Sequence, residues 1–386
     1  MSFLFQTVRV VVAAALFVAL VPATSRSQQV TRRGLDPECL SRISTRMKSL
    51  VDAGAIAGAV TLVARNGKVF HLEATGFQDL ESRKPMRTNT IFDVRSVTKT
   101  VTAVAVMTLI EEGKLGLNDP VEKYLPGFKK ITIHHLLTHT SGLPFSRPAE
   151  IEDITIKRDR TLAEVVALLA KQEPEFTPGT QFRYASSGFA ILGRIIEVVS
   201  GKPYEQFVKE RVFDPLGMRD SFFFIPDDRR ARVASVYRKQ DGKLEKWREI
   251  DEYTRHAKYS APEFGMYSTA EDLAAFCQMM LNGGTFRGRR VLSRMSVAAM
   301  TANHTMNIKS AVTQRPAYNG LGWGLSGDPI DDFPLTSPGS YGHNGAFGSL
   351  IWIDPKEGLV RIFLEQLFGS GSELDIFMAM AGAAVN

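Results

Sequence analysis

The sequence has little of several features that would define a protein class. Its 386 residues include only two cysteines, Cys39 and Cys277, which excludes a disulfide scaffold and leaves open whether the two pair. It has no internal repeat and no low-complexity tract, which excludes a solenoid. The net charge of +6 is spread thinly, which favours a solvated surface over a nucleic-acid interface.

Long apolar runs are also missing. The run from Val10 to Val21, preceded by Arg9, is too short to span a bilayer as a helix. Small residues follow it at 22–27, a pattern typical of an export signal. We therefore predict that residues 1–27 are a signal peptide and that the protein is exported, periplasmic or secreted, in a bacterium. The alternative is an uncleaved leader, the only membrane attachment that we expect.

Strand patterns occur near both ends of the chain. Residues 57–65 and 68–74 are strand-like and flank Asn66-Gly67, the strongest short signal for a β-hairpin. Short β-rich runs return late in the chain, at residues 322–325, 340–343, 348–353 and 359–364. Amphipathic or apolar helical patterns at about 40–51 and 373–384 accompany these two groups of strands.

The middle of the chain has helical periodicity instead. One helix is predicted directly after Ser96, and others at residues 132–139, 162–171, 190–200 and 269–282. Residues 219–262 are only weakly periodic, so we predict that they form an irregular excursion. We therefore predict an α/β (α+β) fold, with an antiparallel sheet built from both chain ends, flanking helices and an inserted, mostly helical lobe. The sheet lobe would comprise about 28–90 and 310–386, and the helical lobe about 91–309. An active site is expected in the groove between them.

The motif Ser96-x-x-Lys99, which precedes an apolar helix, is the first candidate for catalytic chemistry. Residues three apart share a helix face, and a serine hydroxyl becomes a good nucleophile when a neighbouring base takes its proton. Burial and the positive end of a helix dipole both disfavour the ammonium form of lysine, so Lys99 is a candidate base. The alternative for this motif is a helix cap followed by a surface lysine.

Two further motifs supply matching groups. Tyr184-Ala185-Ser186 precedes a predicted helix, and His343-Asn344-Gly345 lies on a late strand. The ordered trio resembles the serine hydrolase superfamily of class C β-lactamases, low-molecular-weight penicillin-binding proteins and β-lactamase-like family VIII carboxylesterases. Flanking segments match the family in order: HLLTHTSGLP at 135–144, FTPG at 176–179, PLGM at 215–218, STAEDL at 268–273, LGWG at 321–324 and GHNG at 342–345.

The resemblance implies a β-lactamase/DD-peptidase-like fold for residues 28–386 and a role for each motif. Ser96 would be the acylated nucleophile, Lys99 would take or share its proton, and Tyr184 would act as general base and then general acid. The backbone N–H groups of Ser96 and of Ala346, which follows the third motif on its strand, would form the oxyanion hole. The resemblance implies no cofactor and no metal.

The substrate-binding positions depart from the β-lactamase pattern. Ser186, His343, Asn344 and Gly345 would line the substrate site, but β-lactamases usually carry Lys-[Ser/Thr]-Gly in the third motif, and class C enzymes have asparagine where Ser186 stands. A mostly neutral histidine holds a carboxylate more weakly than lysine does, which favours ester substrates. A β-lactamase or a D-amino-acid peptidase is the alternative. A non-catalytic protein that senses cell-wall peptides or β-lactams is the alternative from another class.

Several other residues have two readings. His135 and His139 are four apart on a helical pattern, as metal ligands can be, but no acidic partner accompanies them and the family match makes them structural. Trp323 and Trp352 are expected in the core and not as substrate stackers. The run Phe222–Phe224 leaves open whether it packs in the core or lines the acyl pocket.

Overall fold

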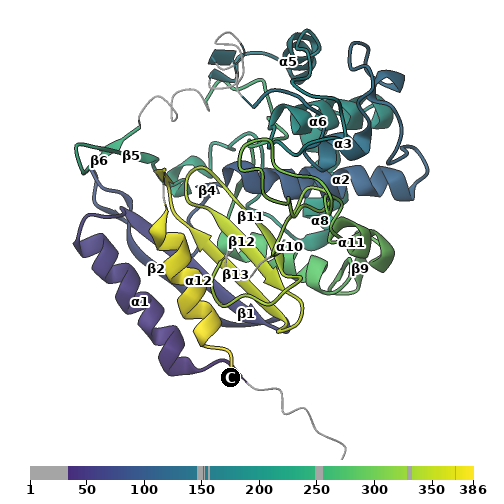
Figure 1. Ribbon diagram of the computed structural model, residues 1–386. Coiled ribbons are helices and arrows are strands. Elements are labelled where there is room, and N and C mark those ends of the chain that lie inside the picture. Colours follow the sequence, from purple (N-terminus) through teal and green to yellow (C-terminus); the bar gives the residue numbers. More distant parts are fainter. Residues whose placement is uncertain are drawn as a thin grey trace, which may run out of the picture. The chain divides into compact units, whose positions relative to one another are not determined.

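A seven-stranded antiparallel sheet joins the two ends of the chain in the computed structural model (Figure 1). The structure describes residues 34–145, 157–247, 255–327, 333–369 and 371–386, and between 146 and 156 only residues 151, 153 and 154. The strand order is β10-β11-β12-β13-β1-β2-β3. The strands are β1 (Gly58–Arg65), β2 (Lys68–Asp79), β3 (Lys84–Pro85), β10 (Gly324–Leu325), β11 (Tyr341–Asn344), β12 (Leu350–Asp354) and β13 (Leu359–Leu364). The predicted α+β fold, with one sheet built from both chain ends, is confirmed.

The first hairpin forms where the sequence predicts it. Asn66 and Gly67 connect β1 to β2 with φ angles of 50° and 81°, which asparagine and glycine tolerate better than other residues. β1 then pairs with β13 on its other side, from Val60 opposite Leu364 to Arg65 opposite Leu359. Strand β1 is therefore held by a neighbour from each end of the chain.

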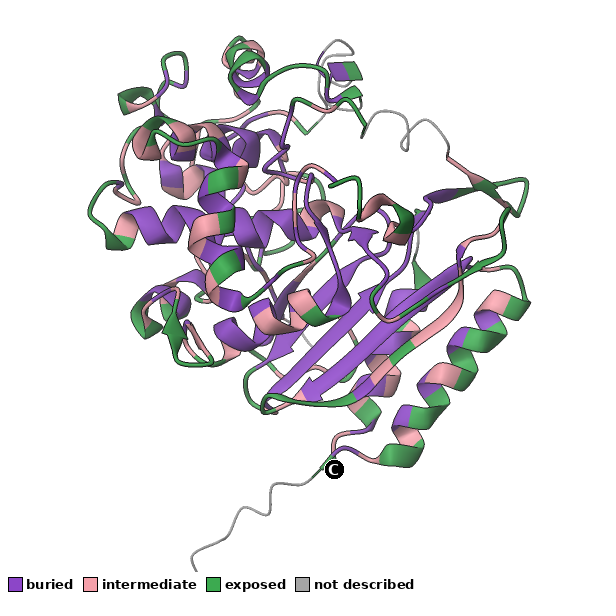
Figure 2. Ribbon diagram, turned by 180° about the vertical axis from the view of Figure 1, so that it is seen from behind, coloured by how far each residue is buried: buried purple, intermediate pink, exposed green. Residues whose placement is uncertain are grey.

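Helices cover both faces of the sheet. Helices α1 (Pro37–Asp52) and α12 (Ser372–Ala383) pack on one face, where their apolar side chains form a core with alternate residues of the strands. Helix α10 (Ala270–Leu281) packs on the opposite face, against β1, β12 and β13. With apolar layers on both sides, all the residues of β12 and β13 are buried, as the purple strands of Figure 2 show.

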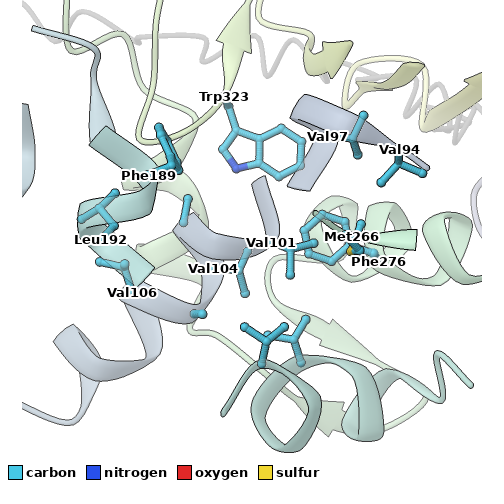
Figure 3. Close-up of a cluster of buried hydrophobic side chains, with 14 of the residues drawn as sticks. Val94, Val97, Val101, Val104, Val106, Phe189, Leu192, Met266, Phe276 and Trp323 are labelled. Atoms are coloured by element: carbon cyan, nitrogen blue, oxygen red, sulfur yellow. The ribbon is translucent and has the colours of Figure 1, made fainter. Parts of the chain in front are cut away.

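Helix α2 (Thr98–Glu111) is the most deeply buried helix of the middle region. Thr98 to Leu109 are all buried, so the helix is enclosed on every side and lacks an exposed polar face. In the close-up of this core, Val101 and Val104 of α2 lie near Phe189, Met266 and Phe276 (Figure 3). The other helices of the middle region are α3 (Ile133–Leu137), α5 (Leu162–Leu169), α6 (Ser187–Ser200), α7 (Tyr204–Val208), α8 (Asp214–Leu216) and α11 (Arg294–Met300), of which α6 and α7 pack against α2.

The irregular excursion predicted at 219–262 is in part wrong. Within it, β5 (Tyr237–Gln240) and β6 (Lys243–Lys246) form a hairpin, and β14 (Leu367–Phe368) pairs in parallel with β5. A second small ladder joins β4 (Phe92–Asp93) to β7 (Tyr267–Ser268). A third joins β8 (Thr285–Phe286) to β9 (Arg289–Arg290).

The remaining fold predictions concern the signal peptide, the two lobes and the cysteines. The predicted signal peptide, residues 1–27, lies outside the described residues, and the division into two lobes near residues 90 and 310 stays a prediction. Cys39 and Cys277 are both free thiols, which answers the question of their pairing. In the described part of the chain, no helix has the length and apolar character needed to cross a membrane.

Candidate active site

Ser96 occupies a short 3₁₀ turn, Arg95–Val97, immediately before helix α2. The expectation that Ser96 and Lys99 share one face of the helix is therefore inexact, because α2 begins only at Thr98. Ser96 is not a helix cap either: the N-cap position belongs to Val97, which makes no side-chain capping bond. Residue 95, which precedes the serine, has a φ of 45°, a left-handed conformation that costs an arginine energy and is characteristic of functional turns.

Lys99 lies beside the candidate nucleophile. Its Nζ atom is 3.0 Å from Ser96 Oγ and 2.7 Å from the carbonyl oxygen of Glu263, and its side chain is completely buried. A surface lysine, the alternative reading of this motif, is therefore excluded. The Glu263 carbonyl can only accept a hydrogen bond, so it fixes Nζ in place next to the serine hydroxyl.

Tyr184 comes from the turn before α6 and meets the same lysine. The Nζ atom of Lys99 lies 4.9 Å from the centroid of the Tyr184 ring, within cation–π range. Lys99 is thus placed against the ring, and within the described structure it makes no hydrogen bond to the Tyr184 hydroxyl. The Tyr184 ring also lies 6.1 Å from that of His343, so residues from all three motifs meet at one place.

His139 packs against the ring of Tyr184, a contact that the sequence did not predict. Its ring lies 4.5 Å from the Tyr184 ring, and its Nδ1 atom accepts a hydrogen bond of 3.2 Å from the backbone N–H of Ala185. Burial, together with the nearby Lys99 and His343, holds the pKa of His139 well below its usual value, so the ring is neutral. The signal for this residue was its place in the segment HLLTHTSGLP, which sequence reasoning took as structural without giving it a partner.

The nearby histidines also bear on the metal-site alternative. His135 Nδ1 accepts from the backbone N–H of Thr132, 3.3 Å away, whereas His139 accepts from Ala185. The two rings thus serve separate backbone groups. Among the described residues, no group of three or more histidine, cysteine, aspartate or glutamate side chains is arranged to hold a metal ion.

His343 is neutral and its tautomer is set by a neighbour. Its Nδ1 atom is 2.7 Å from the carbonyl oxygen of Asn344, which only accepts, so Nδ1 carries the proton and Nε2 is left as an acceptor. Burial, and to a lesser extent the nearby Lys99, lowers the pKa of His343 to about 4. At neutral pH this position therefore offers no positive charge to a substrate carboxylate.

The third motif contacts the turn that carries Ser96. Gly345 packs so tightly that a Cβ atom there would overlap the Val94 carbonyl oxygen and lie only 3.0 Å from Arg95 Cβ. Ser349 Oγ also donates a hydrogen bond of 2.7 Å to the Val94 carbonyl. The segment that follows β11 is thus bound directly to the residues that precede the nucleophile.

The two predicted oxyanion-hole donors are on these neighbouring segments. The sequence predicted Ala346 on the strand of the third motif, and this is wrong. Strand β11 ends at Asn344, and Ala346 lies in the turn that follows. The backbone N–H groups of Ser96 and Ala346 donate to no acceptor among the described residues. Two amides on adjoining turns are therefore available for an oxyanion.

A cavity of about 1110 Å³ opens at residues of the second and third motifs. Tyr184, His343 and Asn344 line it, and the other aromatic residues of its lining are Phe182, Tyr318, Phe333 and Trp352. Arg315 and Asp375 are the only charged side chains among the described lining residues. The described lining does not include Ser96, so this large, mainly uncharged space reaches the site through Tyr184, whose ring lies against Lys99.

The remaining predicted residues have different surroundings. Ser186 is half-buried at the N-cap of α6, where its side chain makes no capping bond, and it is not part of the cavity lining. Trp323 is buried in the core against Phe276 and Tyr341, as predicted, whereas Trp352 belongs both to the core and to the cavity lining. The residues Phe222–Phe224 are absent from the described lining of this cavity.

Comparison with known proteins gives a consistent result. Residues 43–384 match the family model described as Beta-lactamase. The chain is 31% identical over 367 residues to Protein Rv1367c of Mycobacterium tuberculosis, across 83% of this chain and 88% of the relative. It is 35% identical to Esterase EstB of Burkholderia gladioli over 230 residues, or 53% of this chain and 58% of that esterase. A solved structure of EstCE1, a hydrolase with promiscuous acyltransferase activity, superposes with a TM-score of 0.79 at 27% identity, covering 90% of this chain and 99% of EstCE1.

Proposed function

Because this chain belongs to the beta-lactamase family and is a serine hydrolase of that fold, we propose that it cleaves carboxylic esters through an acyl-enzyme on Ser96. The relative named Esterase EstB supports this class of substrate, and the structural neighbour EstCE1 is a hydrolase. The side chains of Ser96, Lys99 and Tyr184 are all present and adjacent, which disfavours a non-catalytic sensor.

The proposed reaction follows from the contacts of the site. Lys99 Nζ, 3.0 Å from Ser96 Oγ, takes the hydroxyl proton as Oγ attacks the ester carbonyl. The carbonyl oxygen becomes an oxyanion, which the N–H groups of Ser96 and Ala346 stabilise. Tyr184 then protonates the departing alkoxide and, in the second half-reaction, removes a proton from the water that hydrolyses the acyl-enzyme.

The preference for esters rests on one observation, the histidine at position 343, where β-lactamases usually carry a lysine. β-Lactams and D-alanyl peptides carry a carboxylate beside the scissile bond, and a cation binds that group better than a neutral imidazole does. His343 keeps Nε2 as an unprotonated acceptor at neutral pH. Such an atom suits a neutral substrate group and repels a carboxylate.

A second candidate, a β-lactamase or D-amino-acid peptidase, is favoured by Arg315. This residue is the only cation among the described residues of the cavity lining, and a guanidinium binds a carboxylate with two hydrogen bonds. If Arg315 serves this function, Arg315→Gln will weaken turnover of nitrocefin or a D-Ala-D-Ala peptide and leave uncharged esters unaffected.

One experiment tests the nucleophile and the substrate class in turn. Incubation with a fluorophosphonate should add its mass to Ser96, as mapped by peptide mass spectrometry, and Ser96→Ala should abolish both labelling and turnover. Rates on p-nitrophenyl butyrate, nitrocefin and a D-Ala-D-Ala peptide then identify the substrate class, with the ester expected to be fastest. A wild-type protein that is folded yet is neither labelled nor active on any of the three refutes the proposal.

Export is a separate part of the proposal. Arg9, the apolar run from Val10 to Val21 and the small residues at 22–27 support it. Expression of the full chain in a bacterium, followed by fractionation and N-terminal sequencing, should give a periplasmic or secreted protein that begins after about residue 25. Retention of Met1 in a cytoplasmic protein would contradict export.

A further inference from the structure

We propose that Arg95 is a positioning residue that holds the two halves of the oxyanion hole at the correct distance. The proposal rests on the proposed function, in which the N–H groups of Ser96 and Ala346 stabilise the oxyanion. Those two amides are about 250 positions apart in the sequence, so their spacing depends on contacts between the turns that carry them. Arg95 makes contacts with both turns.

The first contact fixes the turn that carries Ser96. The backbone N–H of Arg95 donates to Asp93 Oδ1 at 3.1 Å, and Arg95 Nε lies 3.3 Å from Asp93 Oδ2. The same carboxylate thus holds the main chain and the side chain of Arg95. This double attachment stabilises the left-handed φ of 45° at Arg95, an unfavourable conformation at the residue immediately before Ser96.

The second contact reaches the turn that carries Ala346. The guanidinium Cζ of Arg95 lies 3.8 Å from the centroid of the Phe347 ring, a close cation–π contact with the residue that follows Ala346. Phe347 itself is buried and contacts Trp247 and Phe368, so its ring is a fixed support. The guanidinium therefore ties the residue before one amide donor to the residue after the other.

A third contact extends the arrangement to the catalytic lysine. Arg95 Cζ also lies 5.3 Å from the ring of Phe264, which follows Glu263. The carbonyl oxygen of Glu263 is the acceptor that holds Lys99 Nζ. The residue that precedes Ser96 thus also contacts the neighbours of two other backbone groups on which the proposed reaction depends, the Ala346 N–H and the Glu263 carbonyl.

Two variants weaken this arrangement from opposite sides. Arg95→Lys keeps the positive charge and the ion pair with Asp93 but lacks a planar group that stacks on Phe347. Phe347→Leu keeps Arg95 and removes the aromatic face. Arg232→Lys is the matched control, because Arg232 also pairs with an aspartate, Asp220 at 2.8 Å, and its side chain is 23% exposed against 19% for Arg95.

The measurements separate transition-state stabilisation from substrate binding. We would determine kcat and KM on p-nitrophenyl butyrate and the inhibition constant of phenylboronic acid. The boron atom of this inhibitor bonds to Ser96 Oγ, the serine proton passes to the base, and a boron hydroxyl takes the place of the oxyanion. A displaced amide lowers kcat and boronate affinity together, whereas a role in substrate binding changes KM.

We expect each variant to lower kcat about 10- to 100-fold and to weaken the boronate by a similar factor, with KM within about threefold of wild type. Arg232→Lys should stay within about twofold on every measure. Circular dichroism and thermal unfolding check folding, and Phe347→Leu decides the question if Arg95→Lys does not fold. Variants that retain kcat within threefold, or lose kcat with unchanged boronate affinity, overturn the positioning role. Fluorophosphonate labelling of Ser96 in the wild type shows whether such a result leaves the proposed ester hydrolysis standing.

Discussion

The Nζ atom of Lys99 and the Oγ atom of Ser96 are 3.0 Å apart in a site where the lysine has no exposed surface. This pair predicts that Lys99→Met abolishes activation of the nucleophile while leaving an apolar side chain of similar length in the buried space. We expect kcat on p-nitrophenyl butyrate to fall by about three orders of magnitude or more. Lys48→Met, on the exposed face of α1, is the control. A loss of less than tenfold would place the base elsewhere.

The hydroxyl of Tyr184 can be removed without disturbing its ring. Tyr184→Phe should keep the contacts with His139 and Lys99 and lose only the proton transfer. We expect kcat to fall about 10²- to 10⁴-fold with a melting temperature within about two degrees of wild type. Tyr318→Phe, in the same cavity lining, is the matched control. Equal activities of the two variants would argue against a catalytic hydroxyl at position 184.

The pKa of His343 links the site to stability at low pH. In the unfolded chain the imidazole titrates near 6.5, and in the folded protein its pKa is about 4, so the unfolded state binds the proton first as the pH falls. The resulting stability is present above about pH 6.5 and is lost as the pH falls toward 4.

His343→Gln removes this proton linkage. Between pH 7.5 and 4.5, the wild type should lose about 1–3 kcal/mol more unfolding free energy than the variant, as measured by urea denaturation. His256→Gln, at an exposed position, is the control substitution. Parallel losses in wild type and His343→Gln would show that His343 does not titrate as proposed.

Gly345 has no room for a side chain. Gly345→Ala would place a methyl group against the Val94 carbonyl, a backbone atom that cannot move aside without shifting the turn before Ser96. We expect a loss of about 1–3 kcal/mol of stability together with a reduced kcat. Gly34→Ala, where an added Cβ atom meets nothing within 4 Å, is the control. Wild-type kcat and melting temperature in Gly345→Ala would show that the two turns are not in contact.

The sequence predicts those parts of the structure that local chemistry determines. Asn66-Gly67 specifies its hairpin through backbone angles that few residues tolerate, and the hairpin forms there. The motifs around Ser96, Tyr184 and His343 are short sequences with recognisable residue types. The structure brings them together, although their spacing along the chain gives no distance between them.

Features that depend on backbone atoms or on remote partners escaped prediction. The Glu263 carbonyl could belong to any residue type, so no pattern identifies it as the acceptor for Lys99. Ala346 was expected on a strand, but it lies in a turn. That turn after Asn344 is set by packing against Val94, a contact that the sequence does not show. In the β5–β6 hairpin, Asp241-Gly242 is a turn signal, but the exposed, charged residues beside it lack the apolar alternation of a strand.

The position of β13 between β12 and β1 has a consequence for the order of folding. Val60 cannot reach its partner Leu364 until nearly the whole chain has been made, because synthesis proceeds from the N-terminus. Ser96 and Lys99 thus emerge early, and the turn of Ala346 emerges late. Pairings this distant in sequence also make folding slow. For most of synthesis, the proposed nucleophile therefore exists without the proposed oxyanion donor at Ala346. Catalysis is then the last property that the growing chain acquires.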